Sequence, residues 1–478
     1  MTTTNPVTHS PVPHHCLGPS RASALDQDAE TAPTSTGAYR RMFPELPPLP
    51  SDEAFLRELG TSCGAEVSKL SPNGKDDASG AAGWPFLGQF IAHDVTADRS
   101  ALVDRADIEA LKNVRRQKLN LEFLYGSGST GDPYLYDVND PAKLLIGLND
   151  AGQAEDLQRN AQGIAIIVDP RNDSHLLMAQ MQVLFSKFHN RIVDWLRETG
   201  TAEHAIFAEA QRLVVWHYQW IILREFLPEV IGSGLTDALL AGGSRYYRPA
   251  ADPFIPLEFA DAAYRYGHGQ LRESYRVNAG DRPVPLFPDL VGFRAVPASR
   301  VVDWAGFFDL PGRPPAQRAK KLDGRLCSSI MHLPQAITGD VEVEAFHSLA
   351  ARDLQRGHAV GLPSGEAIAR HIGATPLTRE QTALGSMGWD LETPLWYYVL
   401  KESEVQSNGD RLGEVGGRIV GEVLVGLLDH DPSSFRASRP NWRPELPSHV
   451  AGKFTMADLL GFVVGKRDKG RTREHIRP

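Results

Sequence analysis

The sequence predicts a mainly α-helical protein, built as a single large helical domain with long loops and little strand. Apolar residues recur every three to four positions over several long stretches, which is the spacing of one buried helix face. Runs with strand character are short, and residues 163–168 form the best of them. Glycine and proline gather in long connections, and such loops usually carry function or wrap the body; these connections are 126–142, 277–298 and 308–316.

The strongest helical pattern covers residues 176–199, where one apolar stripe repeats at three and four residues. A shorter helix is expected from an N-cap at Ser51 through Leu59, with Gly60 ending it. Further helices are predicted over 203–230, 256–272, 343–355, 378–388, 412–429 and 455–465.

Composition divides the 478 residues into two parts. Residues 1–45 are rich in Thr, Ser, Pro and Ala with little periodicity, which predicts a disordered N-terminal tail that passes into an extended arm. The proline-rich piece 43–50 is expected to lie on the body. Residues 46–478 are expected to form the catalytic domain.

Several classes of protein are disfavoured by charge and composition. The net charge of -9 argues against nucleic acid as a partner, because nonspecific binding needs a basic face. No window has the apolar run of about 20 residues that a membrane span requires. Cys16, Cys63 and Cys327 are widely separated and form no CxxC or CxxCH motif. Sparse cysteines and an N-terminus without an apolar signal region predict a cytoplasmic protein.

Two elements in the first half of the chain carry polar side chains that could do chemistry. Residues 84–94 read as a helix, on which Gln89 and His93 are four apart and share a face. Arg171 follows a short run with strand character. Taken alone, a helical histidine is more often structural, and an arginine at such a turn more often pairs with a carboxylate.

Two more elements lie in the second half. Arg265 precedes Gly267 and His268, and this glycine would let a flat group approach the backbone closely. Asp353 begins a segment that continues to Gly357 and reads, by composition, as a helix end and a turn. Each of these is also explained by ordinary structure when it stands alone.

Taken together and in order, these elements resemble the motifs of the animal-type haem peroxidases, the peroxidase–cyclooxygenase superfamily. The resemblance covers about residues 40–430, and residues 43–50 together with 124–126 are similar to its bacterial branch. The matching positions are Gly88-Gln89-Phe90 with His93-Asp94, then Arg171, His189-Asn190-Arg191, Arg265 with Gly267-His268, Gln355-Arg356-Gly357 and Gly361-Leu362-Pro363.

The resemblance implies a haem-dependent peroxidase that reduces hydrogen peroxide via an oxoferryl intermediate and oxidises a small organic donor or a halide. His268 is then the axial ligand of the haem iron, within the motif that Arg265 begins. His93 exchanges the peroxide proton, which is general acid–base catalysis. Arg171 stabilises the charge that develops as the O–O bond breaks, and Gln89 holds a water or halide near the iron.

Asp353 departs from the family, which has Asn at this position as the partner of the axial histidine. A hydrogen-bond acceptor on the second ring nitrogen raises the basicity of the ligand. A carboxylate does so more strongly, so we expect a lower iron reduction potential than with Asn.

The resemblance also implies a calcium site, with Asp94 as one ligand. The family's loop ligands align with Arg116, Lys118, Asn120 and Glu122. Asn120 and Glu122 keep oxygen ligands that Ca²⁺ accepts, but the other two positions are cationic. Two interpretations stay open: the site binds Ca²⁺, or a cationic side chain replaces the metal and pairs with Asp94.

Covalent attachment of haem b is not expected. The two carboxylates that form esters in mammalian relatives align with Ala92 and Ser174, and the methionine of the third link aligns with His175. Asp173 is adjacent to the second ester position, but a shift of one residue turns a helical side chain by about 100°. The sequence therefore predicts noncovalent haem, and phenols, bromide, iodide or one metabolite as better donors than chloride.

Three alternatives remain, since fold and cofactor do not fix a substrate. A fatty-acid dioxygenase of the superfamily would carry a radical-forming tyrosine where this chain has Arg265, and Tyr264 and Tyr266 are expected to project elsewhere. An oxygenase that acts on one biosynthetic metabolite is the second alternative. A haem-binding protein without turnover is the third, although such a protein has no need of Gln89 and its polar neighbours. The sequence leaves the electron donor and the oligomeric state open.

Overall fold

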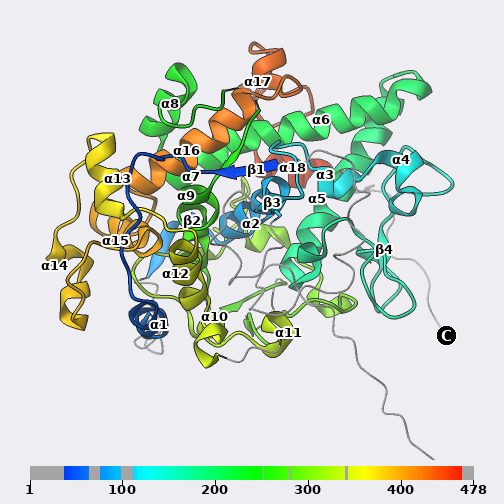
Figure 1. Cartoon of the computed structure of the whole chain (residues 1–478). Helices are drawn as coiled ribbons and strands as arrows, with labels where there is room; N and C mark the ends of the chain where they lie inside the picture. Colours follow the sequence, from blue (N-terminus) through cyan, green and yellow to red (C-terminus); the bar gives the residue numbers. More distant parts are fainter. Residues whose placement is uncertain are drawn as a thin grey trace, which may run out of the picture.

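The computed structural model describes residues 37–63, 76–97, 111–250, 252–278, 280, 282–339 and 343–465. Within these residues the fold is mainly helical, as predicted (Figure 1). The α-helices are α1 (Glu53–Ser62), α2 (Gly83–Val95), α3 (Glu122–Tyr125), α4 (Gly128–Gly131), α5 (Leu176–Glu198), α6 (Ile206–Ile221), α7 (Leu227–Ile231), α8 (Ser233–Gly242), α9 (Leu257–Ala260), α10 (Ser328–Met331), α11 (Gln335–Thr338), α12 (Leu349–Ala359), α13 (Gly365–Ile372), α14 (Arg379–Thr382), α15 (Leu395–Ser407), α16 (Glu414–Asp429), α17 (Phe435–Ser438) and α18 (Met456–Val464).

Tighter and wider helical turns and short strands complete the described fold. The π-helix is η8 (Ile222–Phe226), and the 3₁₀ helices are η5 (Pro133–Leu135), η6 (Pro170–Asp173), η7 (Glu203–Ala205), η9 (Ala263–Gln270), η10 (Ala298–Arg300), η11 (Trp304–Gly306), η12 (Glu344–His347) and η13 (Leu384–Met387). The strands are β1 (Gly37–Arg40), β2 (Asp77–Ala81), β3 (Lys112–Asn113), β4 (Gly147–Leu148), β5 (Ala154–Asp156), β6 (Ile255–Pro256), β7 (Ser274–Tyr275), β8 (Val284–Pro285) and β9 (Arg318–Lys320).

The strands form only small sheets. β1 lies between β3, to which it is antiparallel, and β6, to which it is parallel. The pairs β2–β9, β4–β5 and β7–β8 are antiparallel and two-stranded. None of the described helices combines the length and the apolar character needed to cross a membrane.

Most of the expected helices are present, and four differ in type. Of these, 343–355 is η12 followed by α12, and 378–388 is α14 followed by η13. The stretch 203–230 runs without a break through α6, η8 and α7, but its middle widens into a π turn. The stretch 256–272 is largely 3₁₀ helix (η9) rather than α-helix. Gly267 and Gly269 lie in this segment, and glycine is a poor α-helix former, which favours short tighter turns.

The predicted boundaries of the first helix were wrong at both ends. Its N-cap is Asp52, whose carboxylate accepts from the backbone N–H of Ala54, whereas Ser51 hydrogen-bonds His358. The helix continues past Gly60 to Ser62. A Cβ at Gly60 would lie 2.4 Å from the Cα of Ala351. This glycine therefore permits α1 to pack closely on α12 and does not end the helix.

The predicted strand at 163–168 is absent, and only an isolated bridge joins Ala165 to Arg159. Gly163 has a φ of 80°, which turns the chain out of the extended conformation. The sequence pattern predicted a strand here because it does not register the turn at Gly163.

The predicted tail ended at residue 45, but the folded part of the chain includes residues before that position. β1 already lies in a sheet, and Phe43 is buried in the core. The backbone N–H groups of Met42 and Phe43 donate to the buried carboxylate of Glu258. The arm lies on the body as expected, since the N–H of Leu49 donates to the carbonyl of Leu362. Residues 1–36 lie outside the described part of the chain.

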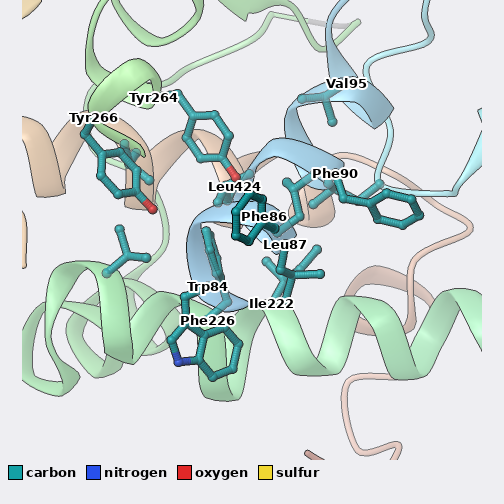
Figure 2. Packing of buried hydrophobic residues seen from close by; sticks show 14 of the residues in the cluster. Trp84, Phe86, Leu87, Phe90, Val95, Ile222, Phe226, Tyr264, Tyr266 and Leu424 are labelled. Carbon is teal, nitrogen blue, oxygen red and sulfur yellow. The ribbon is translucent and has the colours of Figure 1, made fainter. Parts of the chain in front are cut away.

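Helix α2 lies in the centre of the molecule (Figure 1). Its apolar side chains are buried on all sides, with Phe86, Leu87, Phe90 and Ile91 at most 1% exposed. Figure 2 shows these side chains between the helix that carries Ile222 and Phe226 and the segment that carries Tyr264 and Tyr266. The polar residues of such a helix need partners inside the protein.

The His189-Asn190-Arg191 motif anchors a long loop. Asn190 both accepts from the N–H and donates to the carbonyl of Leu144. His189 hydrogen-bonds the hydroxyl of Tyr125 and the carbonyl of Ala142. Residues 125–144 are thereby tied to the middle of α5, so the first two residues of this motif have a structural role.

Candidate functional site

A deep cavity lies between α2 and η9. It contains about 1380 Å³ when the space that opens to solvent is counted. Gln89, Ala92 and Thr96 line it from α2, and the segment 264–268 lines it from η9. Apolar residues between 330 and 349 form another part of the wall.

His268 is fixed in the wall of the cavity by Asp353. The Nδ1 atom of His268 lies 2.5 Å from a carboxylate oxygen of Asp353, which is fully buried. The other carboxylate oxygen pairs with Arg265 at 3.3 Å, and Arg265 also donates to the carbonyl of Ala260. Because Nδ1 is engaged, Nε2 is the ring nitrogen left to bind a metal. The structure thus brings together the three residues that the sequence grouped here.

The space beside His268 suits a flat group such as the expected haem. Gly267 lines the cavity, and a Cβ built on it would meet no atom within 4 Å. Arg356 also lines the cavity, and its guanidinium lies 3.3 Å from Asp261. A planar macrocycle with acidic substituents needs open space and a cation in the wall, and Gly267 and Arg356 provide these, so the residues present fit haem.

His93 is fully buried and held by an amide. Its Nδ1 atom lies 2.7 Å from Oδ1 of Asn172, whose Nδ2 donates to Gln182. An amide oxygen only accepts, so Nδ1 of His93 carries the proton and Nε2 is the basic nitrogen. Burial, and then the charge of Arg171, lower the pKa of His93 to about 3. The imidazole is therefore neutral.

Arg171 connects the cavity wall to His93. Its guanidinium donates to the backbone carbonyl of His93 at 3.1 Å and to both carboxylate oxygens of Asp169. Arg115 pairs with the same carboxylate at 2.7 Å. Burial alone would raise the pKa of Asp169, but the two guanidinium groups lower it well below its usual range. Arg171 is thus held rigidly with its charge only partly neutralised.

Gln89 and His93 differ in their exposure to the cavity. Gln89, Ala92 and Thr96 line the cavity, whereas His93 is fully buried and is not among the lining residues. At about 100° per residue, Ala92 and Thr96 are rotated to one side of Gln89 and His93 to the other.

His175 is a site residue that the sequence did not identify. It lines the cavity, and its Nε2 atom lies 2.9 Å from Oε1 of Gln89. Burial lowers its pKa to about 3. Asn172, the partner of His93, was also missed. Its sequence signal is its proximity to Arg171, and that of His175 is its alignment with the haem-linking methionine of mammalian relatives.

The two positions that form esters in mammalian relatives are in the wall, as the alignment implies. Ala92 and Ser174 both line the cavity. Asp173 does not reach it, because both its carboxylate oxygens pair with Arg159 at 2.7 Å. The nearest substitute carboxylate on this segment is therefore engaged elsewhere.

Tyr264 and Tyr266 belong to the segment that lines the cavity, and their side chains extend into the packed core beside α2 (Figure 2), where Tyr264 stacks on Phe259 with ring centroids 4.5 Å apart. The two tyrosines flank Arg265 in a 3₁₀ turn, where three residues complete a turn and neighbouring side chains spread over all sides. Both hydroxyls are buried, and burial raises the pKa of each well above its usual value.

The expected calcium ligands lie on the far side of α2. Asp94 accepts from the N–H of Leu121, and burial raises its pKa to about 7. One buried oxygen of Glu122 has no hydrogen-bond partner among the described residues, and the carboxylate of Asp94 interacts with the buried hydroxyl of Tyr218. Asn120 caps the turn by accepting from the N–H of Glu122. In the described part of the chain, no group of three or more acidic, cysteine or histidine side chains forms a metal site.

Neither cationic residue of this loop pairs with Asp94. Lys118 lies 2.7 Å from Asp431, and Arg116 is 3.9 Å from Glu122. The interpretation in which one of them replaces the metal at Asp94 is therefore not supported by the geometry. The carboxylates of Asp94 and Glu122 are oxygen ligands of the kind that a small hard cation prefers.

Comparison with known proteins identifies relatives. The family model described as animal haem peroxidase matches residues 105–386, more than half of the chain. Heme peroxidase 2 of Caenorhabditis elegans is 26% identical over 61% of this chain and 43% of its own length. Chorion peroxidase of Drosophila melanogaster is 31% identical over 29% of this chain and 18% of its own length. The chain thus spans less than half the length of these curated relatives.

Solved structures share the fold at low identity. Peroxidase A of Dictyostelium discoideum superposes with a TM-score of 0.53 at 14% identity, over 76% of this chain and 80% of that one. A fatty acid alpha-dioxygenase of Arabidopsis thaliana gives 0.57 at 14% identity, over 81% and 71%. Because one fold serves both chemistries, these likenesses establish the architecture alone.

Proposed function

Because the chain belongs to the animal haem peroxidase family, we propose that it is a haem-dependent peroxidase, an oxidoreductase that uses hydrogen peroxide to oxidise a small organic donor or a halide. The observation that supports this most is the cavity, which combines a carboxylate-held histidine, His268, with the polar groups of Gln89 and Arg171. A passive haem carrier has no use for these polar groups.

His268 would hold the haem iron through Nε2, with Arg356 in the cavity wall as a cation for the acidic substituents. When bound, the haem supplies the redox centre that accepts electrons from the donor and delivers them to peroxide. Asp353 and Arg265 orient His268 and keep its Nδ1 engaged, so its lone pair on Nε2 points at a fixed place in the cavity.

His93 would accept the proton of hydrogen peroxide on Nε2 and return it to the leaving oxygen. Its neutral form and the proton on Nδ1 suit this role. Because His93 is fully buried and does not line the cavity, a small shift of the ring or a bridging water must complete the path. Arg171, held by Asp169, would stabilise the negative charge on the leaving oxygen.

We propose noncovalent haem b, since Ala92 and Ser174 stand where an ester would form and Asp173 is bound to Arg159. Acid acetone should then extract all of the haem, and protein-bound haem after extraction would contradict this. Without the covalent links of the mammalian relatives, the haem is expected to be a weaker oxidant. Phenols, bromide or iodide are therefore better donors than chloride.

We also propose that Ca²⁺ binds between Asp94 and Glu122, with neutral oxygens that include Asn120 completing its shell. Removal of Ca²⁺ with a chelator should lower the melting temperature, because a ligand that binds only the folded state stabilises it. The variant Asp94→Asn should abolish the response, and an unchanged response would refute the site.

The decisive experiment loads the protein with haem and measures oxidation of phenols, bromide and iodide with and without peroxide. We expect oxidation that depends strictly on peroxide. The alternative, a fatty-acid dioxygenase, is favoured by one observation, the presence of Tyr264 and Tyr266 in the cavity wall. Oxygen uptake with palmitic acid and no peroxide, abolished in Tyr264→Phe or Tyr266→Phe, would favour that alternative. Haem binding without any turnover would favour a carrier.

A further inference from the structure

We propose that His175 is a positioning residue that fixes the amide of Gln89 so that its NH₂ group, and not its oxygen, faces the cavity. The inference deepens the proposed function, because it states which kind of ligand this part of the site accepts. A fixed N–H donor favours an anion or an electron-rich oxygen next to Gln89.

The ring of His175 carries its proton on Nε2 and not on Nδ1. This residue caps the N-terminus of α5, and its Nδ1 atom accepts from the backbone N–H of Met178 at 3.3 Å. A backbone N–H only donates, so Nδ1 of His175 has no proton. A neutral imidazole carries one proton, which must then lie on Nε2.

The proton on Nε2 of His175 determines which end of the Gln89 amide faces His175. The Nε2–H group of His175 donates to the atom of Gln89 at 2.9 Å, and that atom must be the oxygen. Gln89 lines the cavity, so the end of its amide that His175 does not hold, the NH₂ group, is the end left for a ligand there. The helix N-terminus thereby determines the hydrogen-bond character of a residue 86 positions away in sequence.

Contacts of its backbone and of its ring hold His175 in place. The adjacent N–H of Leu176 donates to the carbonyl of Leu290, and Gly292 donates to the carbonyl of Ser174. A Cβ at Gly292 would lie 1.8 Å from the carbonyl oxygen of Asp173, so only glycine permits this close approach. Phe86 packs edge-on against the His175 ring with centroids 5.8 Å apart. The imidazole is thus held on both nitrogens, on its face and through its backbone.

His175 and His93 consequently carry their protons on opposite nitrogens. His93 has its proton on Nδ1, bound to Asn172, and a basic Nε2. His175 has a basic Nδ1, used by the helix, and a proton on Nε2. Only His93 is therefore suited to accept a proton from peroxide, and His175 acts through Gln89.

The tautomer can be measured without haem and without turnover. In protein labelled with ¹⁵N-histidine, the signal that disappears in His175→Asn should show a protonated Nε2 and an unprotonated Nδ1 at neutral pH. A protonated Nδ1, or a charged ring, would overturn the inference. This measurement is independent of whether the protein is a peroxidase.

The effect on the site can be measured with fluoride, a small anion that binds ferric haem. Gln89→Leu should weaken fluoride binding by roughly two- to twelve-fold, the range of one net hydrogen bond. His175→Asn should weaken it within the same range, because asparagine keeps the helix cap but is too short to hold Gln89. The double variant should be no weaker than Gln89→Leu alone, since both changes remove one interaction.

A matched control separates this effect from loss of a helix cap. Ser364 caps α13 in the same way, by accepting from the N–H of Ala367. Ser364→Ala should leave the fluoride dissociation constant unchanged. If His175→Asn also leaves it unchanged, or if its effect multiplies with that of Gln89→Leu, the inference is wrong. If the protein fails to oxidise donors while the tautomer and the fluoride coupling are as stated, the proposed peroxidase function fails and the positioning role stands.

Discussion

The α2 side and the η9 side of the cavity hold their histidines with different partners. His93 donates its Nδ1 proton to a neutral amide, that of Asn172, whereas His268 directs Nδ1 to the carboxylate of Asp353. A neutral partner leaves the imidazole uncharged and its other nitrogen free to accept a proton. A carboxylate instead makes the other nitrogen a stronger ligand. One residue type thus serves acid–base chemistry on one side and metal binding on the other.

The largest effect is expected from removing the base on the α2 side. His93→Ala should slow the reaction with peroxide by about 10²–10⁴-fold, the contribution of a well-placed general acid–base group, while haem absorbance persists. His217→Ala is the matched control, because His217 is an equally buried histidine outside the cavity wall. Equal losses in both variants would mean that His93 has only a structural role.

The next largest effect concerns the charge beside His93. Arg171→Gln should slow the peroxide reaction by roughly 10²–10³-fold, as for loss of one donor to a developing anion. Asp169 keeps its partner Arg115 in this variant, so the fold should persist. Arg159→Gln removes another largely buried guanidinium that pairs with two aspartates, and its rate should match that of the unaltered protein. Stopped-flow absorbance measures both.

On the η9 side, Asp353→Asn should raise the midpoint potential of the haem iron. A charged hydrogen bond is replaced by a neutral one, and a difference of about 1 kcal/mol corresponds to roughly 40 mV for one electron. Spectroelectrochemical titration measures the change. A potential that falls, or stays the same, would mean that the carboxylate does not make the iron electron-rich.

The smallest effect is expected from pH. Burial lowers the pKa of His93 to about 3, so the base stays neutral from pH 8 down to about pH 5. The second-order rate constant with peroxide should be flat over this range. Stability behaves differently: an unfolded histidine titrates near pH 6.5, so the buried neutral form costs stability as pH falls from there toward 3. A rate that declines around pH 6.5 while the fold is intact would contradict this pKa.

The sequence was sufficient for the mainly helical fold and for the residues around His268. Motif order and helix period predicted α5 and α16 closely, because each has a long, uninterrupted apolar pattern. The pairing of Asp353 with His268 followed from the resemblance. The helices can be predicted from local periodicity. The residues around His268 can be predicted because binding a haem iron requires particular residue types in a fixed order.

The remaining features depend on contacts that no local pattern encodes. Gln89 and His175 meet across 86 positions of sequence, and the loop at Gly292 fixes the segment before α5 through backbone hydrogen bonds. The alignment identified His175 merely as a position without methionine. The complete burial of His93, and the way Tyr264 and Tyr266 flank Arg265 in a 3₁₀ turn, depend on how α2 and η9 pack in the whole molecule. Such details are set by tertiary packing.

The most direct test of the account is stopped-flow spectroscopy of the haem-loaded protein mixed with hydrogen peroxide and then with a phenol or iodide. The account predicts a rapid spectral change that is proportional to peroxide concentration and is reversed when the donor is added. An absorption spectrum that peroxide leaves unchanged, or a change that no donor reverses, would contradict a peroxidase built on His93 and His268.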